Sequence, residues 1–130
     1  MKMHLEGSGG RLITDYGPGR ICVDGTALEG SVFIAPQGVT QHWFDGDDIS
    51  SLSREHFGDL LTHKPEILIL GSGENHHFPP AQLMQQLAGE GMSLEVMNTR
   101  AACRTYNVLI SEMRDVSAAL LGLPTETSRT

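Results

Sequence analysis

The chain has 130 residues, 39% of them hydrophobic, and a formal net charge of -7 at pH 7. This size and composition are typical of one globular domain with its own core, and they argue against a disordered chain. Phosphate backbones would repel such an acidic surface, so the sequence also argues against non-specific binding of nucleic acids.

The cysteines and the apolar runs indicate where the protein acts. Cys22 and Cys103 make neither a disulfide framework nor a paired-cysteine zinc motif, which favours a reducing compartment. The first residues lack the apolar centre of a signal peptide, and no apolar run is long enough to span a bilayer. We therefore expect a soluble, cytoplasmic protein without a membrane span.

Glycine and proline punctuate residues 3–45 at the spacing of a meander of short strands. Residues 17–19 form a strong turn signal, and Asp24-Gly25 suits the positive φ angles of a tight hairpin turn. We expect the strand that returns from this hairpin to bend at Gly30 and to continue. The expected strands cover residues 11–16, 20–23, 26–36 and 39–43.

A short helix is expected after Ser53, which is a good N-cap residue. Phe57, Leu60 and Leu61 would share one face of this helix. The helix would end just before Pro65, because proline disfavours the helical conformation of the residue that precedes it.

Residues 66–70 form a continuous apolar run rich in β-branched side chains, as in a strand buried on both faces of a parallel sheet. A helix follows from Pro80 and would end at Gly89 or Gly91. The order of strand, helix and strand implies a right-handed parallel crossover, after which a second helix begins. The expected strand, helix, strand and helix cover residues 66–70, 80–89, 93–97 and 99–112.

The end of the chain is less regular. Residues 116–121 fit either a strand or a helix, because alanine and leucine favour a helix but the run is short. Residues 122–130 are polar and are expected to form a flexible tail after a single domain over residues 1–121. The residues expected on the buried face of the last helix are Ala102, Tyr106, Leu109 and Met113.

Two loops, residues 71–75 and 98–100, are expected to leave neighbouring ends of parallel strands. Ligands of open α/β sheets bind at such an edge, and the N–H groups at a helix start favour an anion. Alternatively, the glycines merely permit a tight turn and Asn98 caps the helix. The candidate ligand-binding residues are Gly71, Ser72, Gly73, Asn98, Thr99, Arg100, Cys103 and Arg104.

Two of these candidates are arginines near a helix N-terminus, where the macrodipole is already positive. We therefore expect at least one of Arg100 and Arg104 to be held by an acidic side chain. Glu74 is favoured over Glu112 as the partner, because the two loops should emerge at the same sheet edge.

The catalytic inventory is poor, which favours a protein that is not an enzyme. Cys103 lies in the first turn of a helix, where a thiol pKa can fall, but a buried structural role is the favoured interpretation. Ser72 does not stand in a nucleophile elbow. His76 and His77 lack a third ligand at a suitable spacing, so we expect neither a metal nor a cofactor.

The combined motifs resemble the Mth-type domain family, long described as a domain of unknown function, over roughly residues 10–121. That family includes the mitochondrial complex I assembly factor 3 and the adipogenesis-associated Mth domain protein. The matching segments are residues 65–73, 78–79, Gly91, 95–99, 102–107 and Glu112.

The resemblance implies a three-layer α/β fold with a central mixed sheet, helices on it and an additional N-terminal β layer. It also implies that residues 116–121 are a strand antiparallel to its neighbours. The chain shows no mitochondrial presequence, so we expect a bacterial-type member.

The resemblance and the poor catalytic inventory together favour a non-enzymatic interaction or assembly module with a protein partner, related to respiratory complex assembly. The alternative is a small-molecule (anion) binding protein, or an enzyme, that uses the two loops.

Overall fold

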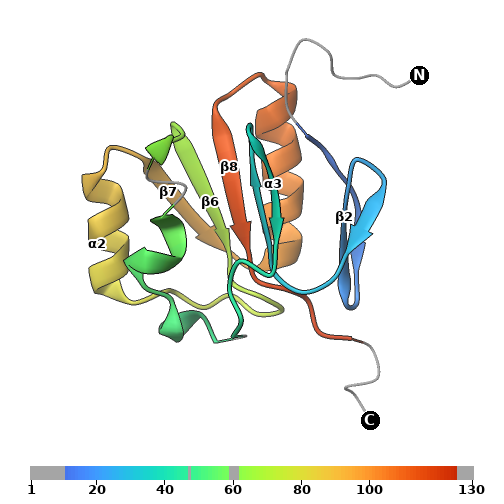
Figure 1. Cartoon of the computed structure of the whole chain (residues 1–130), viewed down its shortest axis with the longest axis horizontal. Helices are drawn as coiled ribbons and strands as arrows, with labels where there is room; N and C mark the ends of the chain where they lie inside the picture. The colour runs from blue at the N-terminus through green and yellow to red at the C-terminus, as the bar shows by residue number, and fades with distance from the viewer. Residues whose placement is uncertain (1–10, 47, 59–61, 126–130) are drawn as a thin grey trace.

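The computed structural model describes residues 11–46, 48–58 and 62–125 (Figure 1). Its strands form a three-stranded antiparallel sheet, in the order β1-β2-β3, and a five-stranded mixed sheet, in the order β5-β4-β8-β6-β7. The first sheet consists of β1 (Ile13–Gly17), β2 (Arg20–Val23) and β3 (Thr26–Leu28). The second consists of β4 (Val32–Ala35), β5 (Gly38–Gln41), β6 (Ile67–Gly71), β7 (Ser93–Met97) and β8 (Val116–Leu120). The helices are α2 (Ala81–Gly89), α3 (Thr99–Ser111) and the 3-10 helices η1 (Ile49–Ser51) and η2 (Arg54–Phe57).

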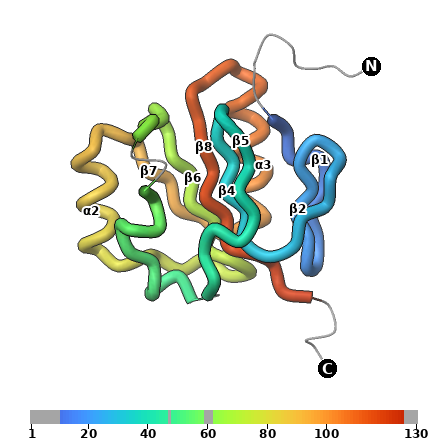
Figure 2. The backbone as a smooth tube through the Cα atoms, in the orientation of Figure 1, coloured from blue at the N-terminus to red at the C-terminus, as the bar shows by residue number. Residues whose placement is uncertain are grey.

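The five-stranded sheet is the middle of three layers (Figures 1 and 2). Helix α3 and the three-stranded sheet cover one face of it, and α2 with the two 3-10 helices covers the other. Side chains alternate between the two cores along β6: Ile69 packs toward α3, whereas Leu68 and Leu70 pack toward α2. The expected three-layer α/β fold with an additional N-terminal β layer is therefore confirmed.

The parallel unit predicted from the apolar runs is present, since β6 pairs in parallel with β7 through the crossover helix α2. Residues 116–120 form strand β8, as the family resemblance implied, but its predicted orientation was only half right. Strand β8 is antiparallel to β4 and parallel to β6. The long return through α3 carries the chain back to the starting edge of β6, which makes this pairing parallel.

The predicted strand over residues 26–36 is two strands that belong to different sheets. Gly30 has a φ angle of +77°, and at this residue the chain leaves the three-stranded sheet and enters the five-stranded one. The expected bend was correct, but periodicity alone could not show that the pairing partner changes there. The predicted strand over residues 39–43 ends at Gln41, because His42 adopts a left-handed conformation with a φ angle of +59°.

The helix predicted after Ser53 begins as η2, which buries Phe57. Leu60 and Leu61, expected on the same face, lie outside the described residues. On α3, Ala102 and Tyr106 are buried as expected. Met113 is 63% exposed, contrary to expectation, because the helix has ended and this residue has a positive φ angle.

The segment expected to form the tail begins against the three-stranded sheet. The N–H of Gly19 donates hydrogen bonds to the carbonyl oxygens of Leu123 and Pro124, and Leu123 is buried. Residues 126–130 lie outside the described part of the chain.

The pH dependence of stability should report the ion pairs of Glu90, the C-cap residue of α2. Arg54 and Lys64 each approach this carboxylate to 2.8 Å, and their hydrogen bonds lower its pKa from 4.5 to about 2. A depressed pKa in the folded state stabilises the fold above the unfolded value, and this contribution is lost as the pH falls toward the folded value. We expect the wild-type chain to have a higher melting temperature than Glu90→Gln near pH 6. This difference in melting temperature should disappear as the pH falls from about 4.5 to about 2.

A melting-temperature difference that stays constant over this range would contradict the expectation. High salt near pH 6 should also narrow the difference, because the pairs are partly exposed and mobile ions screen them.

Candidate functional site

The two loops predicted to form a site do lie together at one edge of the five-stranded sheet. Strands β6 and β7 end side by side, with Gly71 opposite Met97. The N–H of Ser72 donates to the carbonyl oxygen of Met97 at 2.8 Å, and the N–H of Thr99 donates to that of Gly73 at 2.8 Å. The carboxyl ends of the parallel strands are thus bonded directly to each other.

Thr99 is the central side chain of this edge, and it is fully buried. Its Oγ1 accepts a hydrogen bond from the N–H of Gly73 at 2.8 Å and donates one to the carbonyl oxygen of Leu121 at 2.8 Å. One hydroxyl therefore joins the start of α3 to the ends of β6 and β8. A Cβ at Gly71 would lie 3.1 Å from the Cα of Thr99, so this glycine permits the close packing of loop and helix.

The other polar side chains of the two loops also bond within the loops. Ser72 Oγ donates to the carbonyl oxygen of Asn75 at 2.6 Å and accepts from the N–H of His77 at 3.1 Å. Asn98 Oδ1 accepts from the N–H of Ala101 at 2.9 Å, which is an N-cap bond. These contacts match the alternative interpretation, in which the glycine loop forms a turn and the asparagine caps a helix.

The two arginines have different partners. Arg100 Nη2 lies 3.4 Å from Glu74 Oε1, which confirms that at least one arginine is held by an acid and that Glu74 is that acid. Arg104 is exposed and instead donates from Nη1 to the hydroxyl of Tyr16 on β1 at 2.8 Å. Because the pair of Arg100 and Glu74 is largely exposed, its contribution to stability is small.

Cys103 belongs to the core and does not reach the surface at this edge. Its relative exposure is 0%, and burial raises the pKa of its thiol to about 12, against the opposite effect of Arg104 and Arg100. A thiol of this kind remains protonated at neutral pH, which argues against the hypothesis of a reactive cysteine.

A cavity of about 440 Å³ adjoins the glycine loop. Ser72, Gly73 and Glu74 line one side of it, and His42 and Asp45 line another. Neither the helix start at residues 98–100 nor Arg104 contributes to its lining. In the described ranges of the chain, no three His, Cys, Asp or Glu side chains are placed to hold a metal ion.

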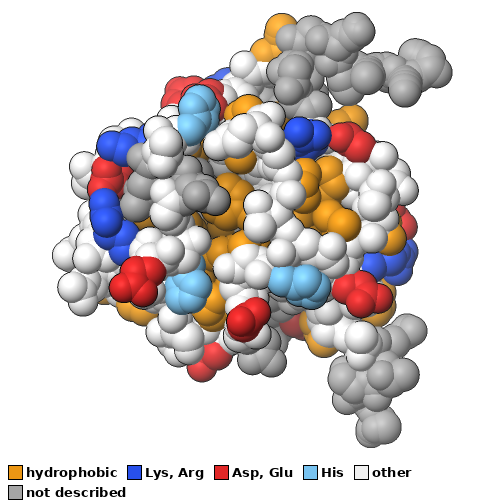
Figure 3. All heavy atoms as spheres, in the orientation of Figure 1, with side chains coloured by type: hydrophobic (Ala, Val, Ile, Leu, Met, Phe, Trp, Pro, Cys, Tyr) orange, Lys and Arg blue, Asp and Glu red, His pale blue; other side chains and the backbone are white. Residues whose placement is uncertain are grey.

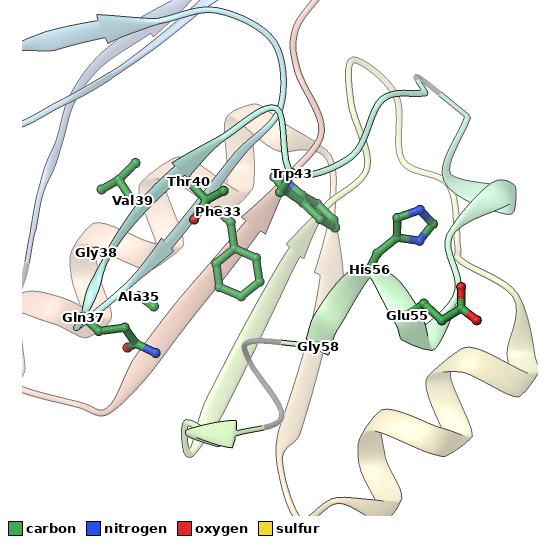
Figure 4. Close-up of a pocket in the computed structure, with 10 residues that line it drawn as sticks. All are labelled: Phe33, Ala35, Gln37, Gly38, Val39, Thr40, Trp43, Glu55, His56 and Gly58. Atoms are coloured by element: carbon green, nitrogen blue, oxygen red, sulfur yellow. The ribbon is translucent and has the colours of Figure 1, made fainter.

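A second cavity, of about 350 Å³, lies between the β4–β5 hairpin and η2 (Figure 4). Phe33 and Trp43 form its apolar side, while Glu55 and His56 come from η2. Sequence reasoning missed this cavity, because its walls come from segments that touch only after folding. The available signal was Trp43, the single tryptophan of the chain.

Trp43 is held in place on several sides. Its Nε1 donates to the carbonyl oxygen of Leu120 at 3.0 Å. Its ring centroid lies 5.8 Å from that of Phe33, 5.8 Å from that of Phe44 and 5.4 Å from that of Phe57. The cavity therefore has an aromatic wall that is fixed in position before anything binds.

Comparison with known proteins finds a matching family model and several similar proteins. A family model described as a protein of unknown function (DUF498/DUF598) matches residues 13–121. NADH dehydrogenase (ubiquinone) 1 alpha subcomplex assembly factor 3 of Danio rerio is 35% identical over 94% of this chain and 70% of that protein. A 13 kDa major membrane protein of Francisella tularensis is 31% identical over 82% of this chain and 87% of that protein.

A solved Bordetella pertussis structure, a Mth938-like domain, has a TM-score of 0.75 and 24% identity over 100% of this chain and 98% of that chain. This likeness shows the fold and agrees with the resemblance read from the motifs. In the described part of the molecule, no helix is long and apolar enough to cross a membrane.

Replacing Thr99 should show how much the edge depends on its hydroxyl. Thr99→Val keeps the shape but leaves the buried N–H of Gly73 and the carbonyl of Leu121 without this partner, so we expect a loss of roughly 2–4 kcal/mol in the free energy of unfolding. Thr99→Ser keeps the hydroxyl and should lose only about 1 kcal/mol, from one methyl group. Urea unfolding measures both, and equal losses would contradict the assigned role.

The burial of Cys103 predicts a slow reaction with thiol reagents. In a Cys22→Ser variant, Cys103 is the only thiol, and its raised pKa leaves almost none of it as thiolate at pH 8. We expect negligible labelling by iodoacetamide in the folded protein and complete labelling in denaturant. Labelling of the folded variant at the rate of a free cysteine would contradict this expectation.

Proposed function

Because the chain belongs to the DUF498/DUF598 family, we propose that it is a non-enzymatic module that binds another protein during the assembly of a larger complex. The observation that carries this proposal is the 35% identity to a relative named as an assembly factor, over 94% of this chain. The match extends over almost the whole chain and over 70% of that relative.

The arrangement of polar groups supports a binding role over a catalytic one. The hydroxyls of Ser72 and Thr99 and the amide oxygen of Asn98 are engaged in hydrogen bonds within the two loops. A nucleophile or an oxyanion site needs such groups to be free and aimed at a substrate. A fixed aromatic wall, in contrast, is a common feature of protein-binding surfaces.

We extend the proposal to the assembly of a respiratory complex, because the relative is named as an assembly factor of NADH dehydrogenase. The module would act from the cytoplasm, in keeping with two free cysteines. A membrane-bound partner would bring it to a membrane surface without a spanning helix, which would account for a relative named as a membrane protein.

The anion-binding alternative derived from the two loops has less support. Arg100 is engaged with Glu74, and the N–H groups of Thr99 and Ala101 are bonded within the chain. The cavity at this edge carries the acidic side chains Asp45 and Glu74 in its lining, which disfavours an anion.

Deletion of the gene in a host that encodes this chain tests the assembly role. We expect membranes of the deletion strain to contain less assembled NADH dehydrogenase complex on native gels, with a matching loss of NADH:quinone oxidoreductase activity. Expression of the wild-type chain should restore both, because it supplies the protein that the deletion removed. Normal amounts of assembled complex in the deletion strain would contradict the respiratory proposal.

A further inference from the structure

Strand β5 ends the five-stranded sheet, and among the described residues it pairs with β4 alone. The N–H of His42 donates to the carbonyl oxygen of Ser31 at 2.7 Å, which fixes the phase of the antiparallel ladder. Bonded and non-bonded pairs alternate along such a ladder, so Val39 and Gln41 fall at non-bonded positions. Their main-chain N–H and C=O groups therefore point away from β4, to the side on which no described strand pairs with β5.

Within its described residues, this edge carries no charge, no proline and no bulge, although β5 is only four residues long. Natural edge strands are commonly blocked by a charged side chain, a proline or a bulge. The sequence of β5 is Gly-Val-Thr-Gln, without charge or proline, and its pairing with β4 is regular. An extended backbone is the ligand that matches such a row of donors and acceptors.

The open edge adjoins the aromatic cavity. Thr40 lies opposite Phe33 in the ladder, and both line the cavity. In Figure 3, hydrophobic side chains gather in a hollow on the face that carries the β4–β5 hairpin. Alternate side chains of an added strand point to the same face, so one of them would enter the cavity beside Trp43. A volume of about 350 Å³ holds a bulky apolar side chain.

A negative charge at the rim of the aromatic cavity indicates the charge of the segment that would bind there. Glu55 is exposed on η2 and lies next to His56 at the η2 rim of the cavity (Figure 4). None of the ion pairs formed by the described residues includes Glu55. Together with the net charge of -7, this carboxylate favours a cationic residue in the segment that binds.

We propose that β5 and the adjoining cavity bind an extended segment of a partner protein, with a bulky aromatic or aliphatic side chain in the cavity and a Lys or Arg near Glu55. The segment adds as a sixth strand to the five-stranded sheet. This inference rests on the proposed function, since it specifies how the module holds its partner.

Selection of random heptapeptides displayed on phage against the immobilised full chain tests the chemistry of the occupant. We expect enriched peptides to carry a bulky apolar residue with Lys or Arg two positions away, because residues two apart share a face of a strand. No enrichment, or enrichment of acidic or proline-rich peptides, would overturn the proposal.

The edge itself is tested with the enriched peptide and a pair of variants at Gln41. Gln41→Pro and Gln41→Ala both lose the side-chain bond to the carbonyl of Glu29, but only the proline loses the outward N–H. Fluorescence anisotropy should show at least about tenfold weaker binding to Gln41→Pro and an unchanged affinity for Gln41→Ala. Equal binding to the two variants would rule out strand addition.

The charge is tested by Glu55→Lys, with Glu112→Lys as the control. Both residues are exposed and the net charge changes equally, but Glu112 follows α3 on the opposite face of the sheet. We expect weaker peptide binding to Glu55→Lys alone. An equal effect of both variants would assign the result to the overall charge and would overturn the role of Glu55.

Size-exclusion chromatography tests whether a second copy of this chain, and not a partner protein, occupies the edge. A wild-type dimer that Gln41→Pro converts to a monomer would show that a second copy fills the edge, and this would overturn the proposal. The outcome is separable from the proposed function. If peptides fail to bind while deletion still reduces the assembled complex, the inference fails and the assembly role stands. If peptides bind and deletion has no effect on the assembled complex, the assembly role fails and the inference of strand addition stands.

Discussion

The fold depends on one buried hydroxyl at the point where three strands end. Thr99 Oγ1 bonds to the main chain after β6 and after β8, and the residue itself begins α3. Without it, the N–H of Gly73 and the carbonyl of Leu121 would each need another partner in a region closed to water. The same contact brings the helix close to β6, which explains why residue 71 is a glycine. The geometry of both loops thus follows from the requirement to satisfy these main-chain groups.

This requirement also separates two kinds of surface on the molecule. At the carboxyl ends of β6 and β7, polar side chains are committed to holding the chain together. On the far side of the sheet, the covering layer of α2, η1 and η2 leaves the aromatic cavity beside the β4–β5 hairpin. The edge at the ends of β6 and β7 resembles a ligand site because of its location in the sheet. The aromatic cavity resembles a binding site because of the residues that line it. At the ends of β6 and β7, the side chains of Ser72, Asn98 and Thr99 form hydrogen bonds within the chain.

The sequence predicted most of the fold but little of the second surface. The β6–α2–β7–α3 unit was visible because burial on two faces of a strand and one face of a helix imposes distinct hydrophobic periods. The change of sheet at Gly30 was not visible in the sequence. A glycine can indicate a bend, but it does not indicate which strand the chain pairs with after the bend. The adjacency of the two loops followed from parallel pairing. The partners of the Thr99 hydroxyl could not be foreseen, because both are main-chain groups more than 20 residues away.

The uncharged edge of β5 bears on how much of this protein a cell can tolerate. An edge open to a partner strand is equally open to another copy, and pairing between copies grows with concentration. On the proposal that a partner strand adds to this edge, copies made in excess of that partner would be the first to self-associate. Balanced synthesis of the two proteins would then protect the edge.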